Sequence, residues 1–457
     1  MAQAFFGGVH PHDMKAATNE KAIEQLAPPA VVVIPMSMHF GAPCTPLVKA
    51  GDHVKVGQKI GEFHGLGAPI HASVSGTVKA VEPRPYSMGG NITSVVIEND
   101  MQDEVSEEVQ APADPNALSV EEMVEIVKNA GIVGMGGATF PTHVKITSGI
   151  GKVNTVIING AECEPYITGD HRTMLERPEE IIGGAKFLAK MFGVDKVVIG
   201  VEDNKRNGID AMNKVIAEQK APVVVEPLRC RYPQGGEKEL CQAITGRQVP
   251  PGGLPADIGC AVFNINTTCA IYRALTTGMP VVRKIVTVSG SGVVEPKNLE
   301  CPIGTPVSSL LDACGGLKDG TYKLIAGGPM MGMAQYTADI SVAKGTGAIL
   351  AFCENEEKTV ENPQCIRCGK CVSDCPMHLE PLFMYQYASK GMVEELNDAH
   401  IMDCMECGAC SYICPARMHL THMFKTGKQL VKDKAAADRA AAEAKKKAEE
   451  AKEAAAK

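Results

Sequence analysis

The residues best suited to carry chemistry are eight cysteines near the C-terminal end of this 457-residue chain. They form two runs of identical spacing, Cys365-x2-Cys368-x2-Cys371-x3-Cys375-Pro376 and Cys404-x2-Cys407-x2-Cys410-x3-Cys414-Pro415. Three thiolates one tight turn apart can bind three corners of an iron–sulfur cube. Gly369 and Gly408 keep each loop free of side chains beside inorganic sulfur, and the prolines end each run. The spacing therefore predicts two metal sites.

Each run matches the cysteine pattern of bacterial two-cluster ferredoxins, in which the fourth cysteine of one run binds the other cluster. We therefore predict two [4Fe-4S] clusters, the first held by Cys365, Cys368, Cys371 and Cys414 and the second by Cys404, Cys407, Cys410 and Cys375. The alternative is a pair of zinc sites, but zinc has no use for a fourth cysteine followed by proline. Paired clusters pass single electrons, so we expect the redox chemistry to begin elsewhere in the chain.

A glycine-rich loop is the candidate starting point. A two-electron donor that feeds one-electron clusters needs a converter, and flavin is the usual one. Residues 131–142 contain four glycines within seven positions, then an aromatic residue and a proline, and Lys145 follows. Such a loop lets backbone N–H groups approach phosphate or a flavin ring, with the lysine as counter-charge. A glycine-rich turn that serves only close packing is the alternative, which the loop alone does not exclude.

The loop from Gly134 to Lys145 resembles the G-R-G-G-A-G-F-P-T-G-x-K loop of the FMN- and NADH-binding subunit of respiratory complex I. Three more segments resemble that family: Asn159-Gly160-Ala161-Glu162-Cys163-Glu164-Pro165 with Asp170 five beyond the proline, Gly235-Gly236-Glu237, and Asn264-Ile265-Asn266-Thr267. The resemblance implies an FMN site made of Gly134, Gly136, Gly137, Lys145, Asn159, Asn264 and Thr267, with Asp170 in the cofactor-binding set. It places against nicotinamide or its ribose Phe140, Glu162, Glu164 and Glu237. Glu162 and Glu164 are the expected catalytic residues.

The chain departs from that family at three places. The arginine of the glycine loop is Met135, the second glutamate of G-E-E is Lys238, and two cluster motifs replace a single one. The first two substitutions are expected to affect NADH affinity more than FMN binding.

The third departure points to a different relative. Together with F-F-G-G-V-H-P at 5–11 and G-G-P-M-M-G at 327–332, it makes the chain resemble the C subunit of the Rnf ion-translocating electron transport complex, to about Lys428. This resemblance implies a peripheral, NAD-side oxidoreductase subunit on the cytoplasmic face of the cell membrane. It would pass electrons between NAD(H), FMN, two clusters and a ferredoxin-linked partner, coupled to sodium or proton transport. The expected partners are other subunits of the complex, including an iron–sulfur or flavin subunit.

Two other functions stay open. A soluble cobalamin reductase of the bacterial microcompartment type shares the flavin-like domain, the third domain and the paired clusters. An electron-transfer scaffold without flavin is suggested by Met135 and Lys238. Flavin content separates the scaffold from both enzymes.

The elements that must position these residues are predicted to form a multidomain α/β and α+β chain. The expected segments are an N-terminal region with a barrel-sandwich β domain (1–100), a Rossmann-like FMN/NADH-binding α/β domain (117–278), a β-grasp-like α+β module of the SLBB type (281–345), a bacterial-ferredoxin-like two-cluster domain (360–428) and an Ala/Lys/Glu-rich tail (432–457). In the first, strands are predicted at 31–34, 51–61 and 72–81, a pattern that resembles biotinyl and lipoyl carrier domains. The hairpin tip at 62–67 has no lysine, which argues against a swinging arm.

Composition excludes other functions. A net charge of -8 with no basic stretch outside the extreme C-terminus argues against nucleic-acid binding. No window approaches the roughly 18 consecutive apolar residues that a membrane span requires, so we expect no direct span. His39, His53, His64 and His71 are interpreted as loop or surface groups. Eight cysteines without ligand spacing are predicted to be buried thiols: Cys44, Cys230, Cys241, Cys260, Cys269, Cys301, Cys314 and Cys353.

Overall fold

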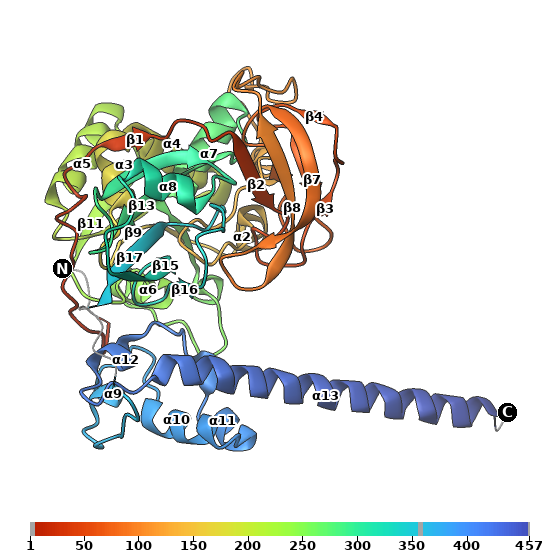
Figure 1. Ribbon diagram of the computed structural model, residues 1–457, viewed down its shortest axis with the longest axis vertical. Coiled ribbons are helices and arrows are strands. Elements are labelled where there is room, and N and C mark those ends of the chain that lie inside the picture. The colour runs from red at the N-terminus through yellow and green to blue at the C-terminus, as the bar shows by residue number, and fades with distance from the viewer. Residues whose placement is uncertain (1–4, 355–359, 456–457) are drawn as a thin grey trace. The chain divides into compact units, whose positions relative to one another are not determined.

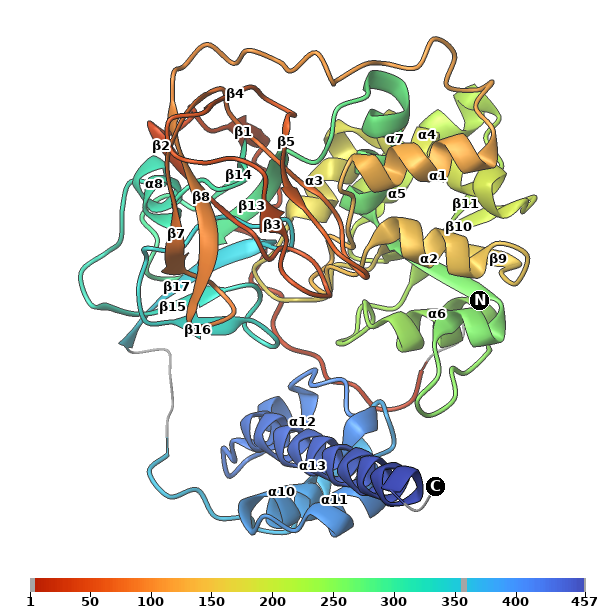
Figure 2. The ribbon, with the colours of Figure 1, turned by 90° about the vertical axis from the view of Figure 1, so that its right-hand side faces the viewer.

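The computed structural model describes residues 5–354 and 360–455, with side chains as far as residue 447. The described residues form two compact units, and each is considered by itself (Figures 1 and 2). The first unit takes in 10–249 and 253–354, and the second takes in 5–9, 250–252 and 360–455.

A barrel-sandwich begins the first unit, as the sequence predicts. Its larger sheet contains, in spatial order, β2 (Val31–Pro35), β8 (Asn91–Asn99), β7 (Gly76–Pro85) and β4 (His53–Val54). Its smaller sheet contains β3 (Thr45–Pro46), β5 (Lys59–Glu62) and β6 (Ile70–His71). Alternation buries Val32 and Ile34 completely, as a half-buried strand requires. Gly76 has φ +149° and lies so close to β8 that a Cβ would be 2.0 Å from the Glu98 carbonyl oxygen.

Two of the predicted strands have different bounds in the structure. The segment 51–61 is divided into β4 and β5 by a turn in which Lys55 N donates to Gln58 Oε1 (3.0 Å). The strand predicted at 72–81 begins only at Gly76. Before that residue, Ser73 Oγ donates to the Ile303 carbonyl and Ser75 Oγ donates to Asp100, so the serines serve tertiary contacts instead of a strand.

The flavin-domain region contains a parallel sheet of four strands: β11 (Val223–Leu228), β10 (Val197–Glu202), β9 (Thr155–Gly160) and β12 (Cys260–Asn264). Its helical elements are α1 (Val120–Asn129), α2 (Thr142–Gly149), α3 (Gly169–Glu176), α4 (Pro178–Phe192), α5 (Arg206–Gln219), α6 (Glu237–Thr245), the 3-10 helix η1 (Pro255–Ile258) and α7 (Ile265–Thr277). Ser119 caps α1 in the predicted capping box with Glu122. Parallel pairing places Asn264 beside Asn159 at the carboxyl ends of β12 and β9. This edge is where α/β sheets bind ligands.

A mixed six-stranded sheet completes the first unit. Its strands, in spatial order, are β1 (Ile23–Gln25), β14 (Lys297–Pro302), β13 (Arg283–Ser289), β17 (Ala348–Cys353), β15 (Thr321–Ala326) and β16 (Met333–Gln335). The helix α8 (Val307–Ala313) buries Val307, Leu310 and Leu311 in the core of this module. The strands β1 and β17 lie outside the range 281–345, so the sheet draws on chain before and after it.

The second unit is helical. Its elements are α9 (Lys370–Ser373), α10 (Pro381–Ser389), α11 (Val393–Asp398), the 3-10 helix η3 (Ile401–Asp403), α12 (Ala409–Ile413) and α13 (Leu420–Ala455). Gly369 and Gly408, with φ +78° and +81°, start α9 and α12 at matching positions of the two cysteine runs. The predicted tail continues α13 as far as Ala455, and its residues 432–447 are exposed. Within the described residues, no helix combines the length and apolar character needed to cross a bilayer.

Candidate functional site

The glycine-rich loop is fastened to the start of α7. Gly134 N donates to the Phe140 carbonyl (2.9 Å), and Thr139 N donates back to the Gly134 carbonyl (3.1 Å), which closes the loop. Met135 N donates to Thr267 Oγ1 (2.9 Å), and that hydroxyl donates to the Val133 carbonyl (3.3 Å). Residues 136–138 remain exposed. The loop thus presents free backbone next to a helix N-terminus, the arrangement that binds phosphate.

A buried polar layer lies beside this loop. Asp170 accepts from Asn264 Nδ2 (2.7 Å) and from Asn266 Nδ2 (2.5 Å), while Asn264 Oδ1 caps α7 by accepting from Asn266 N (2.9 Å). Lys284 Nζ donates to the Met135 carbonyl (3.2 Å) and faces Asp170 electrostatically. Burial lowers the pKa of Lys284 to about 8 and raises the pKa of Asp170. Sequence reasoning missed Lys284, because it lies outside every segment that resembles a known flavin site.

Lys145 and Glu237, predicted for FMN and for nicotinamide, meet in one ion pair. Lys145 Nζ lies 2.6 Å from Glu237 Oε1 and also donates to the Val262 carbonyl (3.0 Å). Both polar atoms of the Asn159 side-chain amide are hydrogen-bonded to backbone groups. Nδ2 donates to the Gly235 carbonyl (2.9 Å), and Oδ1 accepts from Ala161 N (3.1 Å). Asn159 therefore holds two loops together in this conformation.

The two expected catalytic glutamates are both engaged by backbone amides. Glu162 accepts from Asp170 N (2.7 Å) and His171 N (3.3 Å) at the start of α3. Glu164 accepts from Met330 N (3.1 Å) and Met331 N (3.0 Å), in the G-G-P-M-M-G turn. Burial raises the pKa of each carboxyl to about 7. Their charge therefore changes near neutral pH, and each one anchors a neighbouring segment.

A buried lysine fixes the backbone of this glutamate segment. Lys15 Nζ donates to the carbonyls of Glu162 (2.9 Å), Glu164 (2.9 Å) and Ile167. Thr18 Oγ1 adds a contact to Thr168 Oγ1 (2.8 Å). Sequence reasoning also missed Lys15, because it lies some 150 residues from its partners and belongs to no motif.

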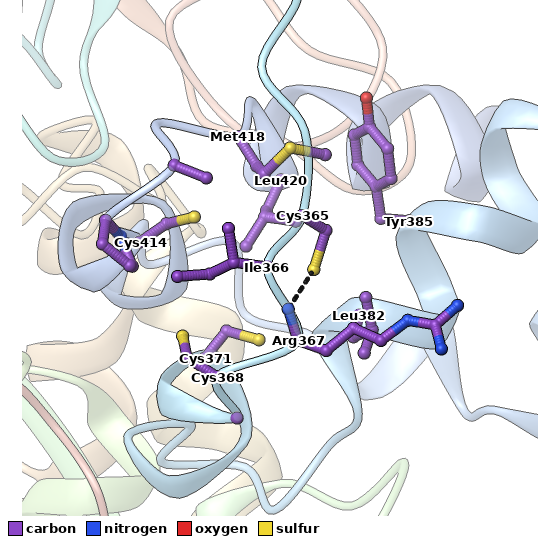
Figure 3. A pocket seen from close by; sticks show the side chains of 13 residues that line it. Cys365, Ile366, Arg367, Cys368, Cys371, Leu382, Tyr385, Cys414, Met418 and Leu420 are labelled. Atoms are coloured by element: carbon purple, nitrogen blue, oxygen red, sulfur yellow. Dashed lines mark hydrogen bonds between the residues drawn. The ribbon is translucent and has the colours of Figure 1, made fainter.

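Two cavities in the second unit are each lined by four of the eight cysteines. As predicted, the fourth cysteine of each run lies with the first three of the other run. Figure 3 shows the first cavity, whose lining includes the four cysteines Cys365, Cys368, Cys371 and Cys414. The lining of the second includes the four cysteines Cys375, Cys404, Cys407 and Cys410. Each cavity therefore holds three thiols of one run and the fourth of the other. This juxtaposition fits the cluster assignment, which stays a prediction until iron is measured.

A [4Fe-4S] cluster is held by four thiolates, so four cysteines that line one cavity suit it. Among residues 5–354 and 360–455, no three His, Cys, Asp or Glu side chains form a group that could hold a metal ion.

Backbone N–H groups point at the sulfurs in both sites. Arg367 N donates to Cys365 Sγ (3.3 Å), and Glu406 N donates to Cys404 Sγ (3.4 Å) at the matching position. Arg367 and Glu406 both have positive φ, 55° and 57°. Such N–H···S bonds are one of the means by which a protein sets a cluster's reduction potential.

Some minor expectations were wrong. His39, in the loop after β2, and His71, in strand β6, are buried instead of lying at the surface, because Gly67 packs against His39 and Gly131 packs against His71. Cys230 is exposed and Cys353 half-buried, whereas the other six cysteines without ligand spacing are buried as predicted.

Comparisons with known proteins add independent findings. The chain matches four domain families in order: the RnfC barrel sandwich hybrid domain (3–102), the Nuo51 FMN-binding domain (127–273), the SLBB domain (285–334) and the 4Fe-4S dicluster domain (357–415).

Three relatives match over most of their length. The C subunit of the Na(+)-translocating ferredoxin:NAD(+) oxidoreductase complex of Acetobacterium woodii is 45% identical, covering 87% of this chain and 90% of the relative. The proton-translocating counterpart from Clostridium ljungdahlii is 43% identical, covering 88% of each. The C subunit of the ion-translocating oxidoreductase complex of Rhodobacter capsulatus is 41% identical, covering 92% of this chain and 82% of the relative.

Among solved structures, an NAD+-reducing [NiFe]-hydrogenase in the H2-reduced state has a similar chain. The TM-score is 0.50 at 18% identity, and the match covers 70% of this chain and 63% of that one. At this identity the likeness concerns the fold alone.

Proposed function

The chain belongs to the family of C subunits of ion-translocating oxidoreductase complexes, and from this membership we propose how its residues divide the work of electron transfer. It is the NAD-side electron-transfer subunit of a multisubunit complex, and its cofactors are FMN and two [4Fe-4S] clusters. This membership sets aside the cobalamin reductase. One combined observation supports the residue assignment. The chain contains a glycine-rich loop bonded to the start of α7, as in a phosphate-binding site, and two cavities that are each lined by four cysteines.

The glycine loop and the start of α7 form the proposed FMN site. Bound FMN supplies the conversion between hydride and single-electron transfer. The exposed amides of 136–138 would face its phosphate or ring, and Thr267 and Asn264 hold the loop and the helix start in place. Lys145 would provide positive charge, shared with Glu237. Lys284 adds a second buried cation behind Met135, which supports binding of an anionic cofactor despite the missing arginine.

Glu162 and Glu164 form the proposed nicotinamide side together with Phe140. Because both carboxylates accept backbone hydrogen bonds, we propose that they act by holding this side in shape. Protonation weakens a carboxylate as an acceptor, and both pKa values lie at about 7. NADH affinity should therefore fall as pH drops below 7. The E162Q/E164Q double variant should remove that dependence, and an unchanged pH profile would argue against this role.

The two clusters form the proposed exit for electrons. Single electrons would pass through them to a ferredoxin-linked iron–sulfur or flavin subunit of the same complex. We place the chain at the cytoplasmic face of the cell membrane as a peripheral subunit, because NAD(H) and ferredoxin are cytoplasmic redox partners. Coupling to sodium or proton movement would reside in other subunits.

Anaerobic purification with iron and flavin analysis tests the function. Two [4Fe-4S] clusters and one flavin predict about eight irons and one FMN per chain, and NADH should bleach the visible spectrum. Eight irons without flavin, even after FMN is added back, would leave an electron-transfer scaffold. The G136A/G137A variant is the matched control: it should lose FMN and keep all iron.

A further inference from the structure

An exposed aromatic side chain of the barrel-sandwich lies at the edge of the glycine loop. Phe40, in the loop after β2, is 59% exposed. Its ring centroid lies 6.0 Å from that of Phe140, and the two ring planes differ by 35°. Phe140 is one of the residues that the complex I resemblance places against nicotinamide or its ribose. The two rings thus form one apolar surface with contributions from two domains.

The backbone around Phe40 is fixed in place. Phe40 N donates to the Thr139 carbonyl (3.0 Å), so the barrel loop is bonded directly to the glycine loop. Gly41 has φ +129°, and a Cβ there would lie 2.0 Å from the Leu66 carbonyl oxygen. His39 Nε2 lies 2.9 Å from the Ala42 carbonyl and closes the turn. The ring is therefore presented by a tight, preorganised loop.

Exposure of such a ring needs a reason. Burying an aromatic side chain is strongly favourable, so aromatic surface held open beside a glycine-rich loop is typical of a ligand-stacking position. Residues 136–138, which precede Phe140 in the glycine loop, are also exposed. A planar heteroaromatic ring that enters beside Phe140 would lie within reach of Phe40. The barrel family match ends at residue 102 and the FMN-binding match begins at 127, so neither one accounts for this pairing.

We propose that Phe40 is a dinucleotide-binding residue, and that the Phe40–Phe140 pair stacks against a planar ring of NAD(H). The barrel-sandwich thereby contributes one wall of the NAD(H) site. This inference rests on the proposed function, because it assumes that NAD(H) binds beside the glycine loop.

Substitution of Phe40 by alanine tests how much the stacking contact contributes to NAD(H) affinity. Loss of one aromatic stacking contact should weaken NAD+ and NADH binding about 3- to 10-fold. FMN affinity and iron content should stay at wild-type values, and F40Y should restore most of the binding. The matched control is L47A, since Leu47 is also an exposed barrel side chain (51%) and its backbone is bonded within the barrel.

The absence of tryptophan from the sequence allows a direct test of contact. F40W in the FMN- and cluster-loaded protein would carry the only indole, and NAD+ that stacks on it should quench its fluorescence saturably. L47W should show no saturable quenching. ADP-ribose and nicotinamide mononucleotide, used separately, identify which ring stacks, and quenching by either supports the proposal.

The outcomes separate the two proposals. Wild-type protein that binds no NAD(H) would overturn the NAD-side function and this inference with it. Wild-type binding that F40A leaves unchanged, with no quenching in F40W, would overturn only the role of Phe40. A loss of FMN affinity in F40A at constant NAD+ affinity would also overturn it, because Phe40 would then belong to the flavin pocket.

Discussion

Cys365 and Cys368 are exposed, whereas their counterparts in the second run, Cys404 and Cys407, are half-buried and buried. The two runs have the same spacing, the same glycine at the start of the short helix and the same N–H···S bond to the first sulfur. One motif has thus been placed in two environments. Spacing determines which thiols share a cluster, while burial and nearby charges determine its potential and its access to solvent.

Apolar side chains of α10 and α13 line both cavities. Met384 and Phe424 line the site of the second run and are almost completely buried. Leu420 is buried in the lining of the first site, but Ile366, in the same lining, is largely exposed. At the second site, Lys428 Nζ is bonded to the Cys404 carbonyl and to Glu406 Oε1 (2.8 Å), whereas Arg367 is the charged residue in the lining of the first cavity. We call these the exposed site (Cys365, Cys368, Cys371, Cys414) and the covered site (Cys404, Cys407, Cys410, Cys375).

The largest expected effect comes from replacing the fourth cysteine of each run by alanine. C414A should remove the cluster of the exposed site and C375A that of the covered site, because each cysteine lines the cavity of the other run. In EPR spectra of the reduced protein, C414A should match C368A, and C375A should match C407A. The exposed Cys230 lies outside both sites, so C230A should keep all iron. A match of C414A with C407A would refute the exchange.

Exposure should make the two clusters differ in lability. Chelator and oxygen reach an exposed cluster more easily, so the exposed site should lose iron several-fold faster than the covered site. The loss of each cluster is followed by EPR during anaerobic treatment with a ferrous chelator or during brief exposure to air. Equal rates would mean that burial of Cys375, Cys407 and Cys410 does not protect the cluster of the covered site.

Removal of one charge should shift one potential. K428M should lower the potential of the covered site by on the order of 40 mV, the one-electron equivalent of about 1 kcal/mol for a partly buried charge. The sign follows because a positive charge favours the reduced, more negative cluster. Lys425 is exposed on the same helix and serves as control. A shift in the exposed site instead would overturn the assignment of Lys428.

The smallest effect concerns the N-terminal segment. The Phe6 ring stacks on His378 at 4.3 Å, next to the chain that carries Cys375. F6A should lower the stability of the covered site by about 1 kcal/mol, the usual value for an aromatic contact. Anaerobic denaturant titration followed by cluster absorbance measures this, with F383A for comparison because Phe383, another exposed ring of the unit, stacks on Tyr387 (6.5 Å) and not on the N-terminal segment. Equal losses in both variants would indicate a general effect on the unit.

Local patterns allowed part of this molecule to be predicted. Ser119 and Glu122 identified the start of α1, because a capping box depends on residues three positions apart. The cysteine spacing anticipated which thiols line each cavity, because it repeats a known motif. The unequal burial of the cysteines in the two runs could not be predicted, because the runs have the same spacing and burial depends on tertiary packing.

The flavin side shows the same limit. The glycine loop was found, but Lys15, Lys284 and Phe40 were not, because each reaches its partner across about 100 to 150 residues of chain. A lysine with no motif carries no sign of the carbonyl oxygens it will bind. Strand bounds around Gly76 were missed for a similar reason, since the serines before it bond to distant groups.

The position of Phe5–Val9 has a consequence for the order of synthesis. This segment belongs to the cluster-binding unit, where Gly8 N donates to the Asp374 carbonyl (2.8 Å) and Gly7 fits closely against Cys375. At about 5–20 residues per second, the segment leaves the ribosome roughly 20–70 s before Asp374 is made. The whole flavin-binding unit is translated in that interval. The cluster-binding unit therefore closes last, and its iron enters a protein whose flavin-binding unit has already been synthesised.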